Sequence, residues 1–109
     1  MKFYVGDYTR LGGPGVCLCE LEGDVLRFLC KGDVCVNDPT YVILSRDKKT
    51  LYATSGTSCD GESTGSIATY DVSCGDLRFT GMHSTGGTAT CHLVLDNAER
   101  FLYAANYMS

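Results

Sequence analysis

Short segments in which apolar and polar residues alternate recur along the whole chain, separated by turns rich in Gly, Asp and Asn. Alternation with a period of two is typical of β-strands that bury one face. No segment of useful length has the apolar spacing that predicts a helix. The predicted strands are Phe3–Tyr8, Val16–Leu21, Val25–Cys30, Tyr41–Ser45, Thr50–Thr54, Ser66–Val72, Leu77–Met82, His92–Leu95 and Arg100–Asn106.

These strands repeat with a period of about fifty residues, which is the most informative feature of the sequence. Residues 51–53 (Leu-Tyr-Ala) recur 51 positions later at 102–104, and a third copy (Phe-Tyr-Val) stands at 3–5, 48 positions before the first. Residues 15–28 and 65–79 form a second matched pair. A repeat of this length made only of strands indicates the blades of a β-propeller.

The repeat predicts a single partial propeller over residues 1–109. Counting strands a to d outward from the channel, residues 1–36 supply strands b to d of blade one, residues 37–85 form a complete blade two, and residues 86–109 begin blade three. We therefore expect an all-β fold of about two and a half four-stranded antiparallel blades. A ring broken after two blades leaves apolar faces in water, so we expect the N-terminal part of a longer protein, a chain that self-associates when isolated and has no useful activity alone.

Charge and hydropathy exclude several classes of partner. The net charge is -4, from nine basic and thirteen acidic residues without a basic cluster, which argues against nucleic acid and anionic membranes. No stretch approaches the roughly 18 apolar residues of a membrane-spanning helix. The N-terminus enters a strand pattern directly and does not resemble a signal peptide. A cytoplasmic protein is expected.

Seven cysteines are many for 109 residues and raise the alternative of a secreted disulfide scaffold. The number is odd, and Cys17 and Cys19 are two apart on one strand, where they share a face but cannot easily bond. No Cys-x-x-Cys pair supports zinc, and no metal or cofactor is expected. We expect reduced thiols that fill space between sheets, with Cys35 and Cys59, in loops, the most exposed.

In an antiparallel meander, the loops after strands b and d lie on one face of the disc and the turns after strands a and c on the other. The first, which we name the loop face, collects residues 7–10, 37–38, 55–64, 83–92 and 106–107. The second, the turn face, carries the short turns at 22–24, 46–49, 73–76 and 96–99. Function in such scaffolds usually lies on the longer loops. His92, near the channel mouth, could bind an anion, activate water or bond a neighbouring loop, and both a site role and a structural role remain open.

Four motifs, in order, resemble the lactonase family of seven-bladed propellers. They are residues 4–9 (Tyr-Val-Gly-Asp-Tyr-Thr), 37–41 (Asn-Asp-Pro-Thr-Tyr), the strand-turn-strand at 44–53, and Cys-His-Leu at 91–93 leading to Ala-Asn-Tyr at 105–107. The similarity runs through all 109 residues. It implies that the blades belong to a seven-bladed ring that hydrolyses a sugar-acid lactone, such as 6-phosphogluconolactone to 6-phosphogluconate, without a metal or cofactor.

Opening a lactone requires an activated water, donors for the oxyanion, and cations if the substrate carries a phosphate or carboxylate. On the family resemblance, His92 is the candidate base or oxyanion partner, Arg10 the anion contact, and Asn106 the orienting group. The loop face has few basic residues, so any phosphate site must draw on later blades.

The sequence departs from the family pattern at points that bear on this chemistry. Asp7 replaces a Thr, and Ser55-Gly56 replaces the usual Asn-Glu, so a carboxylate is missing unless Asp60 or Glu62 supplies it. Thr90 and Asn97 replace prolines, which should affect only loop stiffness. The missing Glu keeps a second class open, a non-catalytic propeller that binds a protein or a small ligand on its loop face.

Other polar and aromatic residues have structural explanations. We expect Arg27 and Arg78 to be solvated residues of outer strands, and His83 to be exposed and inert. Asp47 and Asp96 should form Asx-type turns. The repeated tyrosines, Tyr4, Tyr52 and Tyr103, should pack between blades.

Overall fold

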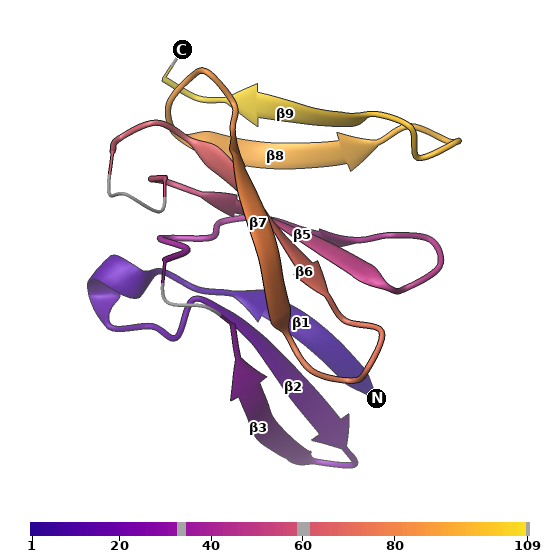
Figure 1. Ribbon diagram of the computed structural model, residues 1–109. Helices are drawn as coiled ribbons and strands as arrows, with labels where there is room; N and C mark the ends of the chain where they lie inside the picture. The colour runs from indigo at the N-terminus through magenta and orange to yellow at the C-terminus, as the bar shows by residue number, and fades with distance from the viewer. Residues whose placement is uncertain (33–34, 59–61, 109) are drawn as a thin grey trace.

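The computed structural model describes residues 1–32, 35–58 and 62–108 of the chain. Within these residues it contains antiparallel strands and one turn of 3-10 helix (Figure 1). The elements are β1 (Lys2–Gly6), η1 (Thr9–Leu11), β2 (Val16–Glu22), β3 (Val25–Lys31), β4 (Val42–Leu44), β5 (Thr50–Ser55), β6 (Ser66–Asp71), β7 (Arg78–Ser84), β8 (Thr90–Leu95) and β9 (Leu102–Asn106).

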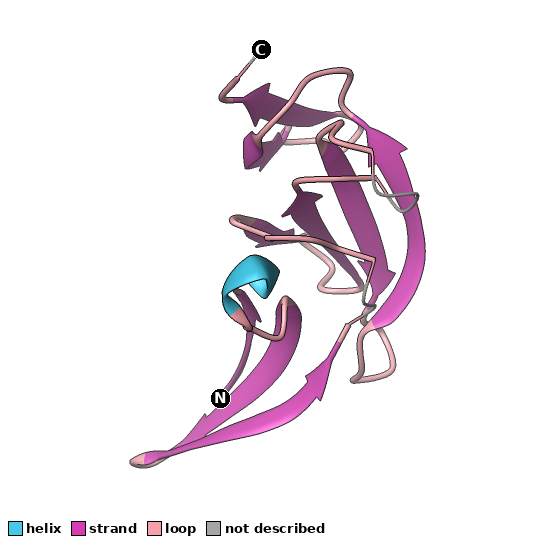
Figure 2. Ribbon diagram, turned by 90° about the vertical axis from the view of Figure 1, so that its left-hand side faces the viewer, coloured by secondary structure: helices cyan, strands magenta, loops and turns pink. Residues whose placement is uncertain are grey.

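The strands form three successive sheets, in the orders β1-β2-β3, β4-β5-β6-β7 and β8-β9. Strands β4 to β7 therefore form one four-stranded antiparallel unit, and the predicted all-β arrangement of successive blades is confirmed. The sheets lie one against the next, with β4 in contact with β1 and β8 (Figures 1 and 2). In Figure 1 the loop face is on the left and the turn face on the right. The blade limits at 36/37 and 85/86 stay a prediction.

Apolar packing between the first and second sheets forms the main core. Its buried members are Val16, Val36, Leu51, Ala53, Ala68, Tyr70 and Val72. The ring of Tyr70 meets Phe79 edge-to-face, with centroids 5.8 Å apart. Burying each large apolar side chain contributes roughly 1.5–3 kcal/mol, which makes this core the principal force holding the first two sheets together.

Glycines permit close approach at two places between these sheets. A Cβ on Gly32 would lie 2.7 Å from Cε1 of the buried Tyr70 ring. A Cβ on Gly6 would lie 2.3 Å from the carbonyl oxygen of Pro39, which enters the second sheet. Neither site has room for a side chain without movement of its neighbour.

The buried cysteines behave as predicted. Cys17 and Cys19 are both buried on β2, where their Sγ atoms lie 3.9 Å apart in a hydrogen bond and form no disulfide. Burial, together with the hydrogen bond to Cys19, raises the pKa of the Cys17 thiol to about 11. A thiol held protonated in this way is a poor nucleophile and acts as a small packing group.

The prediction about exposed thiols is wrong for Cys35, which is only partly exposed. Among the described residues the exposed thiols are instead Cys74, in the β6–β7 turn, and Cys91, at a register shift in β8. Position in a loop did not predict the exposure of Cys35, because segment 35–40 packs against the end of β5. A bulge in β8 turns Cys91 outward. Cys59 lies outside the described residues.

The repeated tyrosines do not share one environment. Tyr4 packs against the main core, as predicted. Tyr103 is 58% exposed on β9, in the last described sheet, so the expectation of packing between blades is wrong for it in this chain. His83 is exposed on β7, as expected.

Polar side chains close the turns. Asp47 accepts hydrogen bonds from the Ser45 hydroxyl at 2.6 Å and from the backbone N–H of Lys49 at 3.0 Å, and Asp96 accepts one from the backbone N–H of Phe101 at 3.0 Å. The bond from Lys49 makes the predicted Asx-type turn at Asp47, whereas Asp96 bonds five residues on and closes its turn without the Asx geometry that was predicted. The Ser45 hydroxyl is the main cause that lowers the pKa of Asp47.

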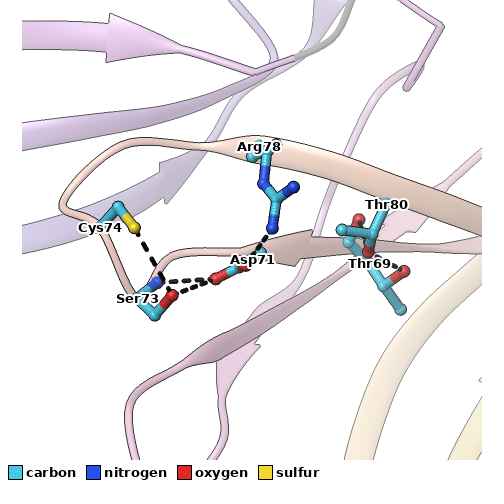
Figure 3. Close-up of polar contacts among 6 residues, drawn as sticks. All are labelled: Thr69, Asp71, Ser73, Cys74, Arg78 and Thr80. Atoms are coloured by element: carbon cyan, nitrogen blue, oxygen red, sulfur yellow. Dashed lines mark hydrogen bonds and ion pairs between the residues drawn. The ribbon is translucent and has the colours of Figure 1, made fainter.

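A denser cluster closes the β6–β7 turn (Figure 3). Asp71 accepts hydrogen bonds from the hydroxyl of Ser73 at 2.6 Å and from its backbone N–H at 2.9 Å, and it also pairs with Arg78. Ser73 first, and Arg78 second, hold the pKa of Asp71 well below its usual range. Arg78 is thus bonded rather than merely solvated, while the exposed Arg27 lies 3.4 Å from Glu22.

No helix among the described residues has the length and apolar character needed to cross a membrane.

Candidate functional site

A hollow of about 600 Å³ opens on the loop face where the three sheets meet. One wall comes from the segment after β1, the floor from the segments before β4 and after β5, and the other wall from the start of β8 and the end of β9. Its lining residues are Tyr8, Arg10, Asn37, Asp38, Thr40, Gly56, Thr57, Ala89, Thr90, Cys91 and Tyr107.

The floor is anchored to the end of β5. The buried Ser55 hydroxyl accepts a hydrogen bond from the backbone N–H of Asn37 at 3.0 Å, and Gly56 donates its N–H to the Asn37 carbonyl at 2.8 Å. The buried Thr54 hydroxyl accepts the N–H of Thr40 at 3.0 Å. These bonds satisfy backbone groups that have no strand partner, and they fix residues 37–40 under the hollow.

Asp38 joins this floor to the first sheet. Its Oδ1 accepts hydrogen bonds from the hydroxyl of Thr9 at 3.2 Å and from the backbone N–H of Arg10 at 3.0 Å. Its own N–H donates to the Thr9 hydroxyl at 3.0 Å. The backbone φ of Asp38 is +46°, a left-handed conformation that Asp and Asn tolerate better than most residues. A two-way clamp therefore holds the η1 turn against segment 37–40.

Arg10 extends from η1 into the hollow, where the sequence predicted an anion contact. Its Nε lies 3.3 Å from Oδ2 of Asp38, and its guanidinium lies over the Tyr8 ring, 5.1 Å from the centroid. The side chain is 71% exposed, against 23% for Asp38. Arg10 is accordingly accessible to a ligand, but a carboxylate already balances its charge.

The opposite wall is held by Asn106. Its Oδ1 accepts hydrogen bonds from the Thr90 hydroxyl at 2.7 Å and from the Thr85 hydroxyl at 3.0 Å. Thr90 is 4% exposed and lines the hollow, whereas Asn106 does not. Asn106, predicted to orient substrate, therefore lies one layer behind the wall and positions Thr90.

His92 lies beside the hollow and is not part of its lining. It follows the register shift in β8, between Thr90 and His92, and it is exposed. Its ring meets Tyr41 edge-to-face with centroids 4.6 Å apart, and Tyr41 directly precedes β4. The imidazole is thus oriented by a neighbouring sheet while remaining open to solvent.

The predicted site residues do not converge on one point. Arg10 reaches into the hollow, Asn106 supports one wall, and His92 stands next to it on β8. Gly56 lines the hollow without a side chain, and the acid in the lining is Asp38. Of the two possible substitute carboxylates, Glu62 is exposed and Asp60 lies outside the described residues.

Sequence reasoning placed Asp38, Thr57 and Tyr107 on the loop face without giving them a role, and it missed the outward turn of Cys91. An Asp before a Pro at the entrance to a blade was the available signal for the clamp. Within the described ranges, no group of three or more His, Cys, Asp or Glu side chains could hold a metal ion.

Comparison with known proteins identifies relatives along the whole chain. A family model described as "Lactonase, 7-bladed beta-propeller" matches residues 2–109. The 6-phosphogluconolactonase of Bacillus subtilis (strain 168) is 31% identical over 110 residues, covering 97% of this chain and 30% of that protein. An uncharacterized protein of Lactococcus lactis subsp. cremoris is 29% identical over 107 residues, covering 97% of this chain and 30% of that protein.

Solved structures share the fold. A candidate 6-phosphogluconolactonase from Bacteroides fragilis superposes with a TM-score of 0.82 at 22% identity, over 98% of this chain and 29% of that one. The periplasmic gluconolactonase of Pseudomonas aeruginosa gives 0.78 at 22% identity, over 96% and 30%. The chain thus spans about 30% of the length of the curated relatives it matches.

Proposed function

Because this chain belongs to the lactonase family of seven-bladed β-propellers, we propose that the complete protein hydrolyses a sugar-acid lactone, with 6-phosphogluconolactone as its substrate. The observation that carries this proposal is the hollow of about 600 Å³ on the loop face, together with the similarity to the Bacillus subtilis 6-phosphogluconolactonase. Its volume lies within the roughly 300–1,000 Å³ of typical small-molecule sites. Its lining offers hydroxyl, amide and guanidinium groups, which suit a hydroxylated ring.

The reaction needs a base for the attacking water, and His92 is our candidate. An imidazole is a common general base toward water, and the edge-to-face contact with Tyr41 orients the ring of His92. Its place beside the hollow would put that water at the edge of a bound ring. Arg10 would contact the substrate. Asn106 would act through Thr90, because its hydrogen bond holds Thr90 in place in the wall of the hollow.

Hydrolysis by the complete protein tests this proposal. We measure the ring opening of 6-phosphogluconolactone through the proton that it releases, and we expect it to be faster with the protein than without it. His92→Ala should lower kcat by about 10²–10⁴-fold, the usual contribution of general acid–base catalysis. His83→Ala is the matched control, because His83 is exposed on the outer strand β7 and should leave the rate unchanged. An unchanged rate in His92→Ala would remove His92 from the mechanism.

A second candidate function is a non-catalytic module that binds a small ligand or a protein on the loop face. The observation in its favour is Gly56, which lines the hollow where the family pattern usually has Glu. A complete, folded protein that binds lactone analogues but shows no lactone hydrolysis would support this candidate over the enzyme.

We propose a cytoplasmic location. Support comes from the neighbouring thiols of Cys17 and Cys19, which form no disulfide with each other. Adjacent thiols that stay reduced are typical of reducing compartments. Fractionation of cells that express the protein, with thiol counting under native conditions, tests the location.

The isolated chain is proposed to self-associate. On β3 the apolar side chains of Val25, Leu26 and Phe28 are 54%, 63% and 57% exposed, and on the third sheet Tyr103 is 58% exposed. Exposed apolar side chains on the first and third sheets favour contact with another copy of the chain. Sedimentation of the isolated chain as a monomer at micromolar concentration would contradict this.

A further inference from the structure

We infer that the wall formed by Arg10, Asp38 and their neighbours binds the uncharged, hydroxyl-bearing ring of the substrate, and that a substrate phosphate lies away from this wall. This inference rests on the proposed function and specifies which part of the lactone this chain recognises. Arg10 then contacts hydroxyl groups of the substrate, and not the anion that the family resemblance suggested for it.

The charge balance of the hollow is the first argument. Among the described lining residues Arg10 is the basic side chain and Asp38 the acidic one, and their Nε and Oδ2 atoms lie 3.3 Å apart. A phosphate carrying nearly two negative charges would gain from Arg10 but would be repelled by the carboxylate beside it. The pair therefore offers a phosphate little net attraction.

The same pair suits neutral hydroxyl groups. A guanidinium offers several N–H donors, and a carboxylate offers acceptors, so the two together present a donor and an acceptor side by side. Neighbouring hydroxyls on a sugar ring are themselves donors and acceptors, and hydrogen bonds to charged groups are stronger than neutral ones. Arg10 keeps its other nitrogens for a ligand, because Nε is the atom that meets Asp38.

The remaining lining is uncharged and partly aromatic. Thr57 accepts a hydrogen bond from Nδ2 of Asn37 at 2.6 Å, which leaves its hydroxyl hydrogen available to a ligand oxygen. Tyr107 lines the hollow and is 80% exposed, and its backbone N–H is fixed to the Ala89 carbonyl at 2.9 Å. A flat aromatic face at the rim suits the C–H face of a sugar ring.

The test uses the complete protein and two pairs of probes that differ only in a phosphate. Hydrolysis is measured with D-glucono-δ-lactone and its 6-phosphate, and binding is measured by calorimetry with the stable δ-lactams of the same two sugars. The variants are Arg10→Gln and Asp38→Asn. Asn keeps the Oδ1 acceptor and tolerates the +46° φ, so Asp38→Asn removes the charge and spares the clamp.

Arg10→Gln should weaken the binding of both lactams by about the same factor, roughly tenfold for a charged hydrogen bond. Asp38→Asn should weaken both by a few fold. In each case the ratio of the two dissociation constants should stay within about twofold of the wild-type ratio. Glu99→Gln, the same carboxylate-to-amide change on the turn face, is the control and should change neither constant.

Selective loss of the phosphorylated ligand in Arg10→Gln, or selective gain in Asp38→Asn, would show that the phosphate sits at this wall and would overturn the inference. A complete protein that binds the lactams with these responses but hydrolyses neither lactone would defeat the proposed catalysis and leave the inference standing. Failure to bind the uncharged lactam at millimolar concentration would overturn the inference even if the phosphorylated lactone is hydrolysed.

Discussion

Two arginine and acid pairs connect neighbouring sheets of this chain, one on each face. On the loop face Asp38 accepts the backbone N–H of Arg10 at 3.0 Å, and on the turn face Glu99 accepts the backbone N–H of Arg46 at 2.6 Å. Both acids have a positive φ, +46° and +55°. The side chains differ, because Arg10 meets Asp38 itself, whereas Arg46 donates to the backbone carbonyl of Asn97 at 2.6 Å.

The difference teaches that similar contacts between blades can serve different ends. An exposed ion pair such as Arg10–Asp38 contributes only about 0–1 kcal/mol, so the buried core holds the first two sheets together. The turn-face contact consists of exposed hydrogen bonds, each worth about 0.5–1.5 kcal/mol. The turn-face pair ties one turn to the next. The loop-face pair borders a hollow and keeps a guanidinium directed into it. We therefore expect changes on the loop face to alter ligand binding, and changes on the turn face to alter stability alone.

The largest effect should come from separating the first two sheets at the loop face. Gly6→Ala places a Cβ 2.3 Å from the Pro39 carbonyl oxygen, so β1 and the floor of the hollow must move apart. We expect the free energy of unfolding to fall by about 2 kcal/mol, as for other overpacked sites. Lactone hydrolysis should fall by about 100-fold, since displacements of about 1 Å have that cost. Urea unfolding and kcat/KM of the complete protein measure the two effects.

Gly81→Ala is the control for this change. A Cβ on Gly81 would meet Thr69 Oγ1 at 3.8 Å, an ordinary contact, and Gly81 lies on the outer strand β7. It should leave both quantities nearly unchanged. Equal losses in the two variants would show that glycine flexibility, rather than close approach near the hollow, explains the effect of Gly6→Ala.

The second-largest effect should come from removing the acid of the loop-face pair or the acid of the turn-face pair. Asp38→Ala and Glu99→Ala each remove the side-chain acceptor of an exposed backbone N–H, so each should cost about 0.5–1.5 kcal/mol of stability. Only Asp38→Ala should also lower kcat/KM, by about tenfold, because it releases Arg10 from the wall of the hollow. Parallel losses of activity in both variants would contradict the assignment of binding to the loop face.

Much of this architecture could be predicted from the sequence, because alternation and turn chemistry are local. The strands were predicted with ends shifted by a few residues, as for β9, which begins at Leu102 rather than Arg100. The two pairs could not be predicted in this way. Arg10 and Asp38 are 28 positions apart, and Arg46 and Glu99 are 53 apart, so their contacts depend on how one blade rests on the next.

The candidate site was predictable only in part for the same reason. The loop face was predicted correctly as the location of Arg10, but the charge balance by Asp38 could not be seen. The outward turn of Cys91 depends on a register shift against β9, which no local pattern in β8 indicates. Asn106 accepts a hydrogen bond from the hydroxyl of Thr90, and this contact between two strands could not be predicted from a local pattern.

Two carboxylates on the turn face, those of Asp71 and Asp47, should make the stability of the protein decrease in acid. Ser73 and Arg78 lower the pKa of Asp71, and Ser45 lowers the pKa of Asp47. A carboxyl with a folded pKa below its unfolded value of about 4 adds stability that is fully present above that pH and is lost as the pH falls further. Asp71→Asn should therefore flatten the decline of the urea midpoint below about pH 4.

Ser73→Ala should flatten this decline less than Asp71→Asn, because the backbone N–H of residue 73 and Arg78 still favour the charged carboxylate. Both variants should retain lactone hydrolysis at neutral pH, since the cluster lies on the turn face. An acid decline that is equally steep in Asp71→Asn and in the wild type would show that other groups determine it.

The smallest expected effect is a gain in stability on the turn face. Lys48 has a φ of +62° in the β4–β5 turn, where its backbone N–H donates to the Ser45 carbonyl at 2.9 Å. Glycine adopts this conformation without the steric cost of a Cβ, about 1 kcal/mol, but it also loses more chain entropy on folding. Lys48→Gly should therefore raise the free energy of unfolding by about 0.5 kcal/mol and leave kcat/KM unchanged, because the turn is far from the hollow. Lys49→Gly, at the next position without a positive φ, should instead lower stability, and a change in kcat/KM in Lys48→Gly would mean that the two faces are coupled.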